Sequence, residues 1–226
     1  MCARSADRDP ISELTTSRLS VYLRCLTFLD SIGETTISSH ELAERFHLNS
    51  AQIRKDLACF GEFGTRGVGY DVAQLRANLV QALGLDRTRH AVIIGAGNLG
   101  MALADYAGFN NRGFSIIALL DTDGNRVGLT SRSGIQVSHY DDLSEIVKRG
   151  SVEIGIIAVP ADSAQIVLDA LAHAGVSAIL NFAPVQLRRP PGVKVRSVDL
   201  RINLESLAFH LKNVEDRAFD DADPKE

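Results

Sequence analysis

The glycine-rich stretch Gly95–Gly100, with the sequence GAGNLG, constrains the fold more than any other part of the chain. It follows a short apolar run that begins at His90 and has the pattern of a strand, and it precedes residues 101–106, which are helix formers. Asp121 ends the next predicted strand, 21 residues after Gly100. A strand, a G-x-G-x-x-G turn, a helix and an acidic residue at this spacing form the fingerprint of a dinucleotide-binding βαβ unit.

Each part of this fingerprint has a physical role. Gly95 allows the tight turn, Gly97 lets a pyrophosphate approach the backbone, and Gly100 lets the helix pack closely on the strand. Asp121 can accept hydrogen bonds from both hydroxyls of an adenosine ribose and would repel a 2′-phosphate, which favours NAD(H) over NADP(H). Arg126 is near enough in sequence to pair with a 2′-phosphate, but we expect it to be solvated. A tight turn that binds no ligand is the alternative to a dinucleotide site formed by Gly95, Ala96, Gly97, Asn98, Leu99, Gly100 and Asp121.

The rest of the second half of the chain alternates predicted strands with predicted helices. The strands are apolar nearly throughout, which is typical of parallel strands covered on both faces. We therefore predict an α/β fold with a doubly wound parallel sheet, a Rossmann domain. The predicted strands after the first are residues 115–120, 153–159, 177–181 and 193–198, with helices around 143–148 and 161–174.

Two segments at predicted carboxyl ends of strands extend the candidate site, because ligands of open α/β sheets bind outside those ends. We expect Asn181 to bond a nicotinamide amide, and Phe182 and Pro184 to wall off the ring. The alternative is that Pro160 and Pro184 only end their strands. The predicted cofactor-binding residues of these segments are Val159, Pro160, Asn181, Phe182, Ala183 and Pro184.

Residues 17–85 differ from the rest of the chain because nearly all of them have helical spacing. The sequence Ser38-Ser-His-Glu has the form of a capping box ahead of a short helix, and a second start signal at Asn49 opens another helix over residues 51–60. Two short helices joined by a tight turn form a helix-turn-helix. The glycine-rich stretch 61–72 then has the pattern of a hairpin, so we predict a winged helix-turn-helix domain.

Residues 51–60 are interpreted as a DNA recognition helix. Polar residues gather in its N-terminal half, the part that meets base edges in helix-turn-helix proteins, while Ile53 and Leu57 can face the core. Arg66, at the tip of the wing, is placed to reach a minor groove. A small helical oligomerisation domain with solvated charges is the alternative. The predicted DNA-binding residues are Ser50, Gln52, Arg54, Lys55, Arg66 and Gly67.

Overall charge argues against nucleic acid as a partner. The chain has 24 Lys and Arg against 28 Asp and Glu, a net charge of −4, and residues 1–85 alone have 9 against 10. Double-stranded DNA is therefore predicted from the positions of a few basic residues and not from a basic domain.

The cysteines and the apolar segments indicate the compartment. Three cysteines, in no CxxC pair, suit a reducing compartment and indicate no metal site. The N-terminus is charged, and the longest apolar run, 154–161, is far shorter than a membrane span. We expect a cytoplasmic protein with no membrane partner.

Catalytic groups are not evident beside the predicted dinucleotide site. A dehydrogenase needs a general acid or base near the nicotinamide, and none of the six histidines ends a predicted strand. His139 and His173 lie in or beside predicted helices, and His90 lies at the wrong end of its strand. We therefore predict that the chain is not an enzyme and that it binds the nucleotide as a signal without converting it. An NAD-dependent dehydrogenase and a CoA-binding module are the alternative functions.

An apolar stripe near the C-terminus predicts a dimer. Apolar residues recur at helical spacing at Leu204, Leu207, Ala208, Leu211 and Val214, a stripe too long for a segment that only caps its own sheet. Ordinary packing on the parent domain is the alternative. The predicted organisation is a flexible N-terminus (1–16), a winged-helix domain (17–85), a Rossmann domain (86–200), a C-terminal dimerisation helix (201–219) and an acidic disordered tail (220–226).

Several long motifs occur together in the order found in one protein family. They are AQIRKDL from Ala51, FGEFGTRGVGYDV from Phe60, GAGNLG from Gly95, Val159-Pro, ILNFAP from Ile179 and Val198-Asp-Leu. With these motifs the chain resembles, from about Leu19 to about Leu211, the Rex family of bacterial redox-sensing transcriptional repressors. The resemblance implies a homodimer that binds palindromic operators when NAD+ dominates and is released when NADH binds. It also implies NAD(H) as a regulatory ligand and a C-terminal helix that is swapped between the two Rossmann domains.

The resemblance further implies a set of coupling residues. Family members couple their domains through residues that match Arg24, Tyr106 and Asp199, contributed across the dimer. A charge-assisted contact between Arg24 and Asp199 can be made in one conformation and broken in another, which suits a switch. The alternative is a static surface ion pair.

Overall fold

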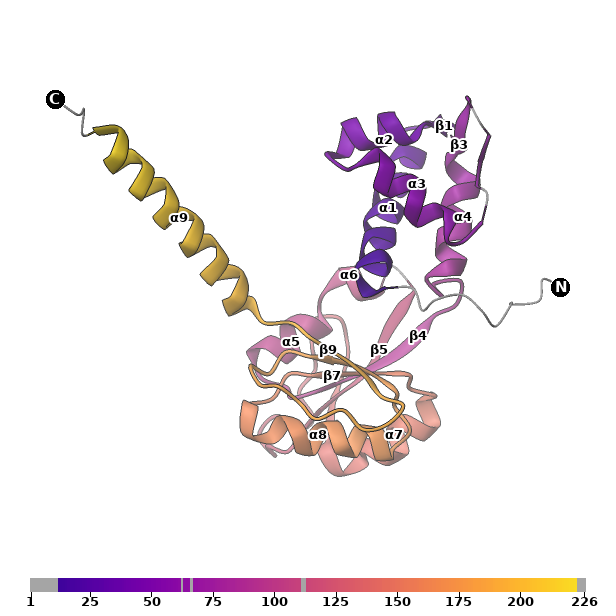
Figure 1. The fold of residues 1–226 in the computed structure, drawn as a ribbon. Helices are drawn as coiled ribbons and strands as arrows, with labels where there is room; N and C mark the ends of the chain where they lie inside the picture. Colours follow the sequence, from indigo (N-terminus) through magenta and orange to yellow (C-terminus); the bar gives the residue numbers. More distant parts are fainter. Residues whose placement is uncertain (1–11, 62, 66, 111–112, 223–226) are drawn as a thin grey trace. The chain divides into compact units, whose positions relative to one another are not determined.

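The computed structural model describes residues 12–61, 63–65, 67–110 and 113–222. It divides the chain into two compact units, Met1–Arg87 and Thr88–Glu226 (Figure 1). Each unit has buried apolar clusters of its own. The two units are therefore described one after the other.

Helices make up most of the N-terminal unit. Each begins after a polar residue whose side chain accepts a backbone N–H of the first turn, and Ser38 and Glu41 complete the predicted capping box. These caps satisfy N–H groups that the start of a helix leaves without partners. The helices and their caps are α1 (Glu13–Ser31) with Ser12, α2 (Ser39–Phe46) with Ser38, α3 (Ser50–Ala58) with Asn49, and α4 (Val72–Ala82) with Asp71.

Short antiparallel strands form the predicted wing. Strand β3 (Gly69–Asp71) pairs with β2 (Gly64–Thr65) on one side and with β1 (Thr36–Ile37) on the other. Gly67 lies in the turn with a φ of +84°, a conformation that favours glycine. β1 was not predicted, because a two-residue strand has too little pattern to recognise.

The helices of the N-terminal unit share one core. Each fully buried aliphatic side chain contributes about 1.5–3 kcal/mol relative to an exposed one, so this core holds the short helices together. The side chains that are at most 2% exposed include Leu19, Leu26, Leu29, Leu42, Ile53, Leu57, Leu75 and Leu79.

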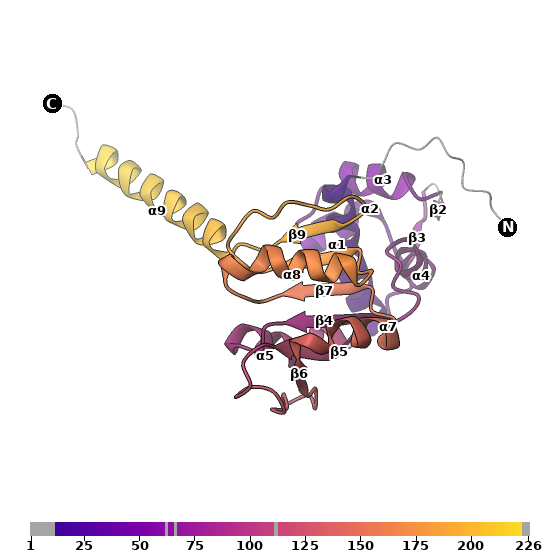
Figure 2. The ribbon, with the colours of Figure 1, turned by 90° about the horizontal axis from the view of Figure 1, so that it is seen from below.

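The C-terminal unit is built on a parallel sheet in the order β6-β5-β4-β7-β8-β9 (Figure 2). The chain proceeds from β4 to one edge of the sheet and then returns to β7 on the other side of β4. The strand order therefore reverses between β4 and β7, and the predicted doubly wound sheet is confirmed. The strands are β4 (Arg89–Ile94), β5 (Phe114–Asp121), β6 (Val137–His139), β7 (Ile154–Ile157), β8 (Ala178–Asn181) and β9 (Lys194–Ser197).

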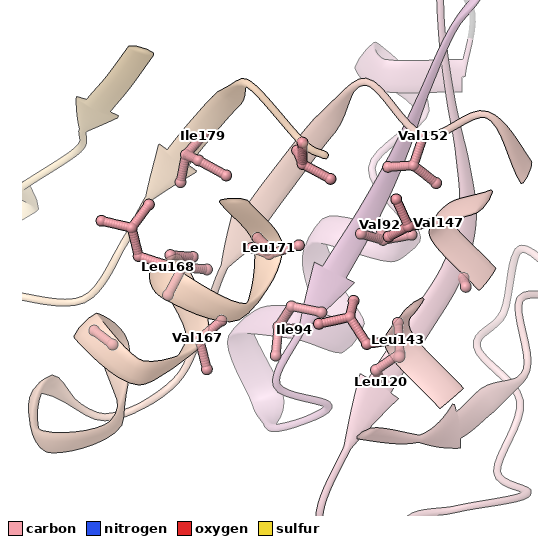
Figure 3. Packing of buried hydrophobic residues seen from close by; sticks show 14 of the residues in the cluster. Val92, Ile94, Leu120, Leu143, Val147, Val152, Val167, Leu168, Leu171 and Ile179 are labelled. Atoms are coloured by element: carbon pink, nitrogen blue, oxygen red, sulfur yellow. The ribbon is translucent and has the colours of Figure 1, made fainter. Parts of the chain in front are cut away.

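Helices cover both faces of this sheet, α5 (Asn98–Ala104) and α6 (Ala107–Asn110) on one face, and α7 (Leu143–Gly150) and α8 (Ala161–His173) on the other. On the second face Val92 and Ile94 of β4 lie among side chains of α7 and α8, such as Val147 and Leu171 (Figure 3). Ala91 and Ile93 point to the opposite face. This explains why the strands are apolar at successive positions.

The structure corrects two predicted boundaries. α1 begins at Glu13, inside the segment predicted to be flexible, because Ser12 caps it; residues 1–11 lie outside the described part of the chain. Helix α9 (Leu200–Ala222) extends into the tail predicted to be disordered. Residues 200–223 contain no glycine or proline, so nothing in the sequence stops this helix before Pro224. Within the described residues, no helix is both long enough and apolar enough to span a membrane.

Candidate functional site

The loop between β4 and α5 and the start of α5 have two positions, Gly95 and Gly100, that only glycine fits. Gly95 has a φ of +105°, and a Cβ there would stand 2.5 Å from the carbonyl oxygen of Ala158. A Cβ on Gly100 would collide with the carbonyl oxygen of Gly95. At Gly97 the nearest atom to a Cβ would be Nη1 of Arg126, 3.9 Å away, so the surface there is open. Gly95 thus allows the turn, Gly100 allows the helix to pack closely, and Gly97 leaves room for a ligand to approach the backbone.

The carboxylate of Asp121, the last residue of β5, ties this loop to the sheet. Asp121 is 7% exposed, and its Oδ2 accepts the N–H of Ala96 at 2.7 Å while its Oδ1 accepts the N–H of Asp123 at 2.9 Å. Burial alone would raise the pKa of this carboxyl. The two backbone donors and the guanidinium of Arg126 outweigh burial and hold the pKa of Asp121 below its ordinary value. The group is therefore ionised at neutral pH.

Arg126, which was expected to be solvated, is ion-paired. Its Nη1 donates to Oδ2 of Asp121 at 3.0 Å, and its Nε lies 3.5 Å from Oδ2 of Asp123. Its side chain is 44% exposed, as expected, but the two ion pairs were not predicted, because a sequence separation of five residues does not show that the turn after β5 folds back on the strand end.

A cavity of about 700 Å³ opens at the carboxyl ends of β4, β5 and β7, where the strand order reverses. Its volume is within the range of about 300–1,000 Å³ that is usual for small-molecule sites. Other residues that line it include Arg126, Tyr140, Ser163 and Ile166, the last two from the first turns of α8. The predicted residues that line it are Gly95, Gly97, Asn98, Leu99, Asp121, Val159 and Pro160.

The remaining predicted cofactor-binding residues lie outside the lining of this cavity, namely Ala96, Gly100, Asn181, Phe182, Ala183 and Pro184. Asn181 is fully buried; its Nδ2 donates to the carbonyl oxygen of Ala183 at 3.0 Å and to Oγ of Ser197 at 3.3 Å. Its Oδ1 accepts the N–H of Ala183 at 2.9 Å. Both polar groups of Asn181 are therefore used to hold the turn after β8 and to tie β8 to β9.

Tyr140 is a residue of the cavity that the sequence did not indicate. It follows β6, and its hydroxyl is buried without a hydrogen-bond partner among the described residues. Burial, with a smaller contribution from Asp141, raises its pKa above the ordinary value. A buried hydroxyl without a partner costs about 1–3 kcal/mol, so a ligand that bonded it would recover that energy. Strand β6 was not predicted, because three residues at a sheet edge show little pattern.

The prediction that no histidine ends a strand is wrong, because the short strand β6 was not predicted. His139 is the last residue of β6, and its Nδ1 accepts the N–H of Asp141 at 3.3 Å at the start of the short 3-10 helix η1 (Tyr140–Asp142). His139 is nevertheless not among the residues that line the cavity. In the part of the chain that the structure describes, no three or more His, Cys, Asp or Glu side chains gather to hold a metal ion.

Helix α3 of the N-terminal unit presents basic side chains to solvent. Arg54 and Lys55 are exposed, Ser50 is half-buried at the first turn, and Gly67 is exposed in the wing. Nη1 of Arg54 donates to Oγ of Ser39 at 2.9 Å, which links α3 to α2. Arg66, the remaining predicted contact, lies outside the described residues.

A buried carboxylate, Asp56, fixes α3 against α1. Its Oδ2 accepts Nε of Arg18 at 2.6 Å and the hydroxyl of Tyr22 at 3.0 Å, and its Oδ1 accepts Nη2 of Arg18 at 2.8 Å and Nε2 of Gln52 at 2.7 Å. Burial would raise the pKa of Asp56, but these donors hold it below its ordinary value. Burial and the hydrogen bond to Asp56 raise the pKa of Tyr22 to about 12. The network also uses the amide nitrogen of Gln52, which was predicted to meet a base.

The residues assigned to coupling belong to both units. Arg24 is exposed on α1, and Tyr106 is 56% exposed with its ring edge-on to Phe109 at a centroid distance of 5.0 Å. Asp199 precedes α9, and its Oδ1 accepts the N–H of Arg201 at 2.9 Å.

Helix α9 exposes a long apolar surface. The side chain of Val214, part of the predicted stripe, lies outside those that the structure describes. The large apolar side chains that are 61–69% exposed are Leu200, Ile202, Leu204, Leu207, Phe209 and Leu211.

A winged helix-turn-helix unit followed by a sheet with a cavity at its switch point defines a DNA-binding regulator that responds to a small ligand. Two family models match the same two parts of the chain. One, described as a putative DNA-binding protein N-terminus, matches residues 10–58, and the other, described as a CoA binding domain, matches residues 86–185.

Relatives that align with most of the chain identify its family. The chain is 52% identical over 202 residues to the redox-sensing transcriptional repressor Rex of Carboxydothermus hydrogenoformans, with 89% of this chain and 97% of that one covered. It is 50% identical over 216 residues to the Rex of Streptomyces coelicolor, with 95% and 83% covered. The chain belongs to the Rex family of redox-sensing transcriptional repressors, and it is a regulator and not an enzyme.

Solved structures agree with this assignment. The chain matches RSP in complex with β-NAD+ and operator DNA at a TM-score of 0.87 and 36% identity, with 96% of this chain and 100% of that one covered. It matches RSP in complex with β-NADH at a TM-score of 0.82 and 35% identity, with the same coverage. RSP is described as a Rex-family repressor. The predicted family and fold class are confirmed.

We predict that Gly100→Ala destabilises the C-terminal unit. The new methyl group would collide with the backbone carbonyl of Gly95, which no side-chain rotation relieves, so the free energy of unfolding should fall by at least about 1–3 kcal/mol. Gly124→Ala is the control, because a Cβ there meets nothing within 4 Å. Chemical denaturation measures both, and equal stabilities would contradict the packing described for the loop.

We predict that Asp56→Asn lowers the stability of the N-terminal unit in a pH-dependent manner. Because the folded pKa of Asp56 is depressed, its contribution is present above its unfolded pKa of about 3.9 and is lost as pH falls through the folded value. At pH 7 the loss should be about 2 kcal/mol or more, and it should shrink as the pH is lowered below about 4.

The matched control for Asp56 is Asp30→Asn. Asp30 pairs with Arg76 across 3.3 Å, but its side chain is 40% exposed, so the loss should be below about 1 kcal/mol. Denaturant unfolding at several pH values measures the difference between each variant and the wild type. A loss for Asp56→Asn that does not change with pH would show that the carboxylate charge is not the stabilising feature.

Proposed function

We propose that this repressor binds operator DNA as a homodimer and is released when NADH enters the cavity of the C-terminal unit. The relatives support this, since RSP was crystallised with β-NAD+ and operator DNA and also with β-NADH. The observation that carries the proposal is the cavity at the switch point with the buried carboxylate of Asp121 in its wall. In sheets of this strand order, dinucleotides bind at that place.

The residues of the cavity fit NAD(H). The surface at Gly97 is open to a pyrophosphate, Asp121 is an ionised acceptor for a ribose hydroxyl, and the hydroxyl of Tyr140 would gain the partner it lacks among the described residues. Asn181 and Phe182 we assign to the support of the neighbouring turn. The proposed binding residues are Gly95, Gly97, Asn98, Leu99, Asp121, Tyr140, Val159 and Pro160.

The walls of the cavity give a physical basis for sensing the redox state. The oxidised nicotinamide ring is positively charged, whereas the reduced ring is neutral and more apolar. Apolar walls that include Val159 and Pro160 disfavour an unpaired charge, so the site should bind NADH more tightly. A ligand that favours one arrangement of the protein lowers the population of the other, including the arrangement that binds DNA.

The N-terminal unit supplies the proposed DNA contacts. Arg54 and Lys55 suit phosphates or guanine, and Arg66 suits the minor groove at the wing. Ser50, Gln52 and Gly67 complete the proposed contact surface. Because operator DNA lies in the bacterial cytoplasm, we place the protein there.

The dimer is proposed to form through α9. An exposed apolar surface of this length is unusual on a monomer, and a second copy of the chain offers the same surface and the same sheet as a partner. We propose that α9 is swapped between protomers and that Arg24, Tyr106 and Asp199 transmit the change across the dimer. A contact between the charges of Arg24 and Asp199 would be made in only one of the two arrangements.

We predict that operator DNA and NADH weaken each other's binding by the same factor, because linkage between two sites is reciprocal. NADH is titrated into the protein with and without a palindromic operator duplex, at fixed salt because DNA affinity falls steeply with salt. Equal NADH affinities in the two titrations would refute the switch. Steady oxidation of NADH with a small carbonyl substrate would instead favour a dehydrogenase, and CoA binding without operator binding would favour a CoA-binding module.

We predict that Lys55→Ala abolishes specific operator binding and leaves the NADH affinity unchanged, because Lys55 lies on the exposed face of α3 and belongs to the other unit. Lys148→Ala, at an exposed position of α7, removes the same charge elsewhere and is the control. Gel shift measures DNA binding and fluorescence titration measures NADH binding. Loss of both activities in the Lys55 variant would indicate misfolding or a wrong assignment of α3.

A further inference from the structure

Arg126 is a cation of the cavity wall to which the proposed function gives no role. Its side chain is 44% exposed, and Nη1 is the atom nearest to the open surface of Gly97. The guanidinium pairs with Asp121 through Nη1 and with Asp123 through Nε. One positive charge therefore stands between two carboxylates that largely neutralise it.

The hydrogen-bonding capacity of Asp121 shows what this pairing controls. Each carboxylate oxygen can accept about two hydrogen bonds. Oδ2 already accepts two hydrogen bonds, from the N–H of Ala96 and from Nη1 of Arg126. Oδ1 accepts the N–H of Asp123 and can accept one more hydrogen bond. A ribose diol offers two hydroxyls, so it can use both oxygens of Asp121 only if Arg126 leaves Oδ2. Arg126 thus competes with the diol for the same carboxylate.

We infer that Arg126 selects between dinucleotides that carry a 2′-hydroxyl and those that carry a 2′-phosphate. This inference rests on the proposed function, because it requires a dinucleotide in the cavity. While Asp121 and Asp123 hold the guanidinium, its charge is unavailable to a 2′-phosphate, which Asp121 also repels. Once it is no longer paired with Asp121, the guanidinium can bind a 2′-phosphate, as an arginine does in NADP(H) sites. Preference for NAD(H) thus depends on the ion pair as well as on the carboxylate.

The test compares NADPH binding with and without Arg126 in a background that lacks the Asp121 charge. Asp121→Asn keeps an oxygen that can accept the N–H of Ala96 and frees the guanidinium. We expect its NADPH affinity to rise about tenfold over the wild type, the size of one charge-assisted hydrogen bond, and its NADH affinity to fall. The double variant Asp121→Asn with Arg126→Ala should lose the gain for NADPH. Fluorescence titration of the full-length protein measures each affinity.

Two further variants keep the test decisive. Asp121→Ser also removes the carboxylate that holds Nη1 of Arg126 and keeps a side-chain oxygen close to the backbone, so it replaces Asp121→Asn if that variant unfolds, with the same comparison of NADPH binding with and without Arg126. Arg149→Ala removes a paired, exposed arginine of α7 and should change neither affinity by more than about twofold. Thermal unfolding shows which variants are folded.

The outcomes separate the inference from the proposed function. Equal NADPH affinities in a folded Asp121→Asn variant with and without Arg126 overturn the inference while leaving NADH sensing intact. A wild-type protein that binds no NADH overturns the proposed function itself. A gain in NADPH affinity that disappears with Arg126 supports the inference.

Discussion

The backbone of Gly95 lies against the backbone of Ala158 and of Gly100, and the candidate site depends on this packing. Because only a hydrogen atom fits at these points, β4 can turn at Gly95 while α5 returns over it and β7 ends beside it. The N–H of Gly95 donates to the carbonyl oxygen of Leu120 at 2.7 Å, which brings in the end of β5. The carboxyl ends of β4, β5 and β7 thus meet at the loop that begins with Gly95, and the cavity lies beside these three strand ends.

The parts of the fold that the sequence predicts well are those with strong local causes. The capping box at Ser38 and Glu41 forms because the residues involved are close neighbours in the chain. The glycine loop is recognisable because steric limits on the backbone leave no other residue type at Gly95 and Gly100. The apolar strands of the sheet are recognisable because helices bury both of their faces.

The features that escaped prediction depend on contacts between segments that are distant in sequence or on elements too short to show a pattern. Asn181 looked like a ligand group, yet Ser197 and Ala183 use its amide, and no property of residue 181 itself indicates that. Tyr140 was missed because the strand before it has three residues. Arg126 shows the same limit, since its partners become visible only when the turn after β5 is folded.

The ionic network of Asp56 bears on how an acidic chain can bind DNA and still release it. Arg18 is used inside the N-terminal unit to neutralise Asp56, so that cation orients α3 and adds little to the charge that faces DNA. Under the proposed function, a chain with a net charge of −4 would bind DNA through a few cations such as Arg54 and Lys55, which are exposed on α3. With so few cations, we expect the non-specific attraction to DNA to be weak. Coupling energies between ligand sites are typically about 1–3 kcal/mol, which is enough to control an interaction of modest electrostatic strength but not one dominated by many phosphate contacts.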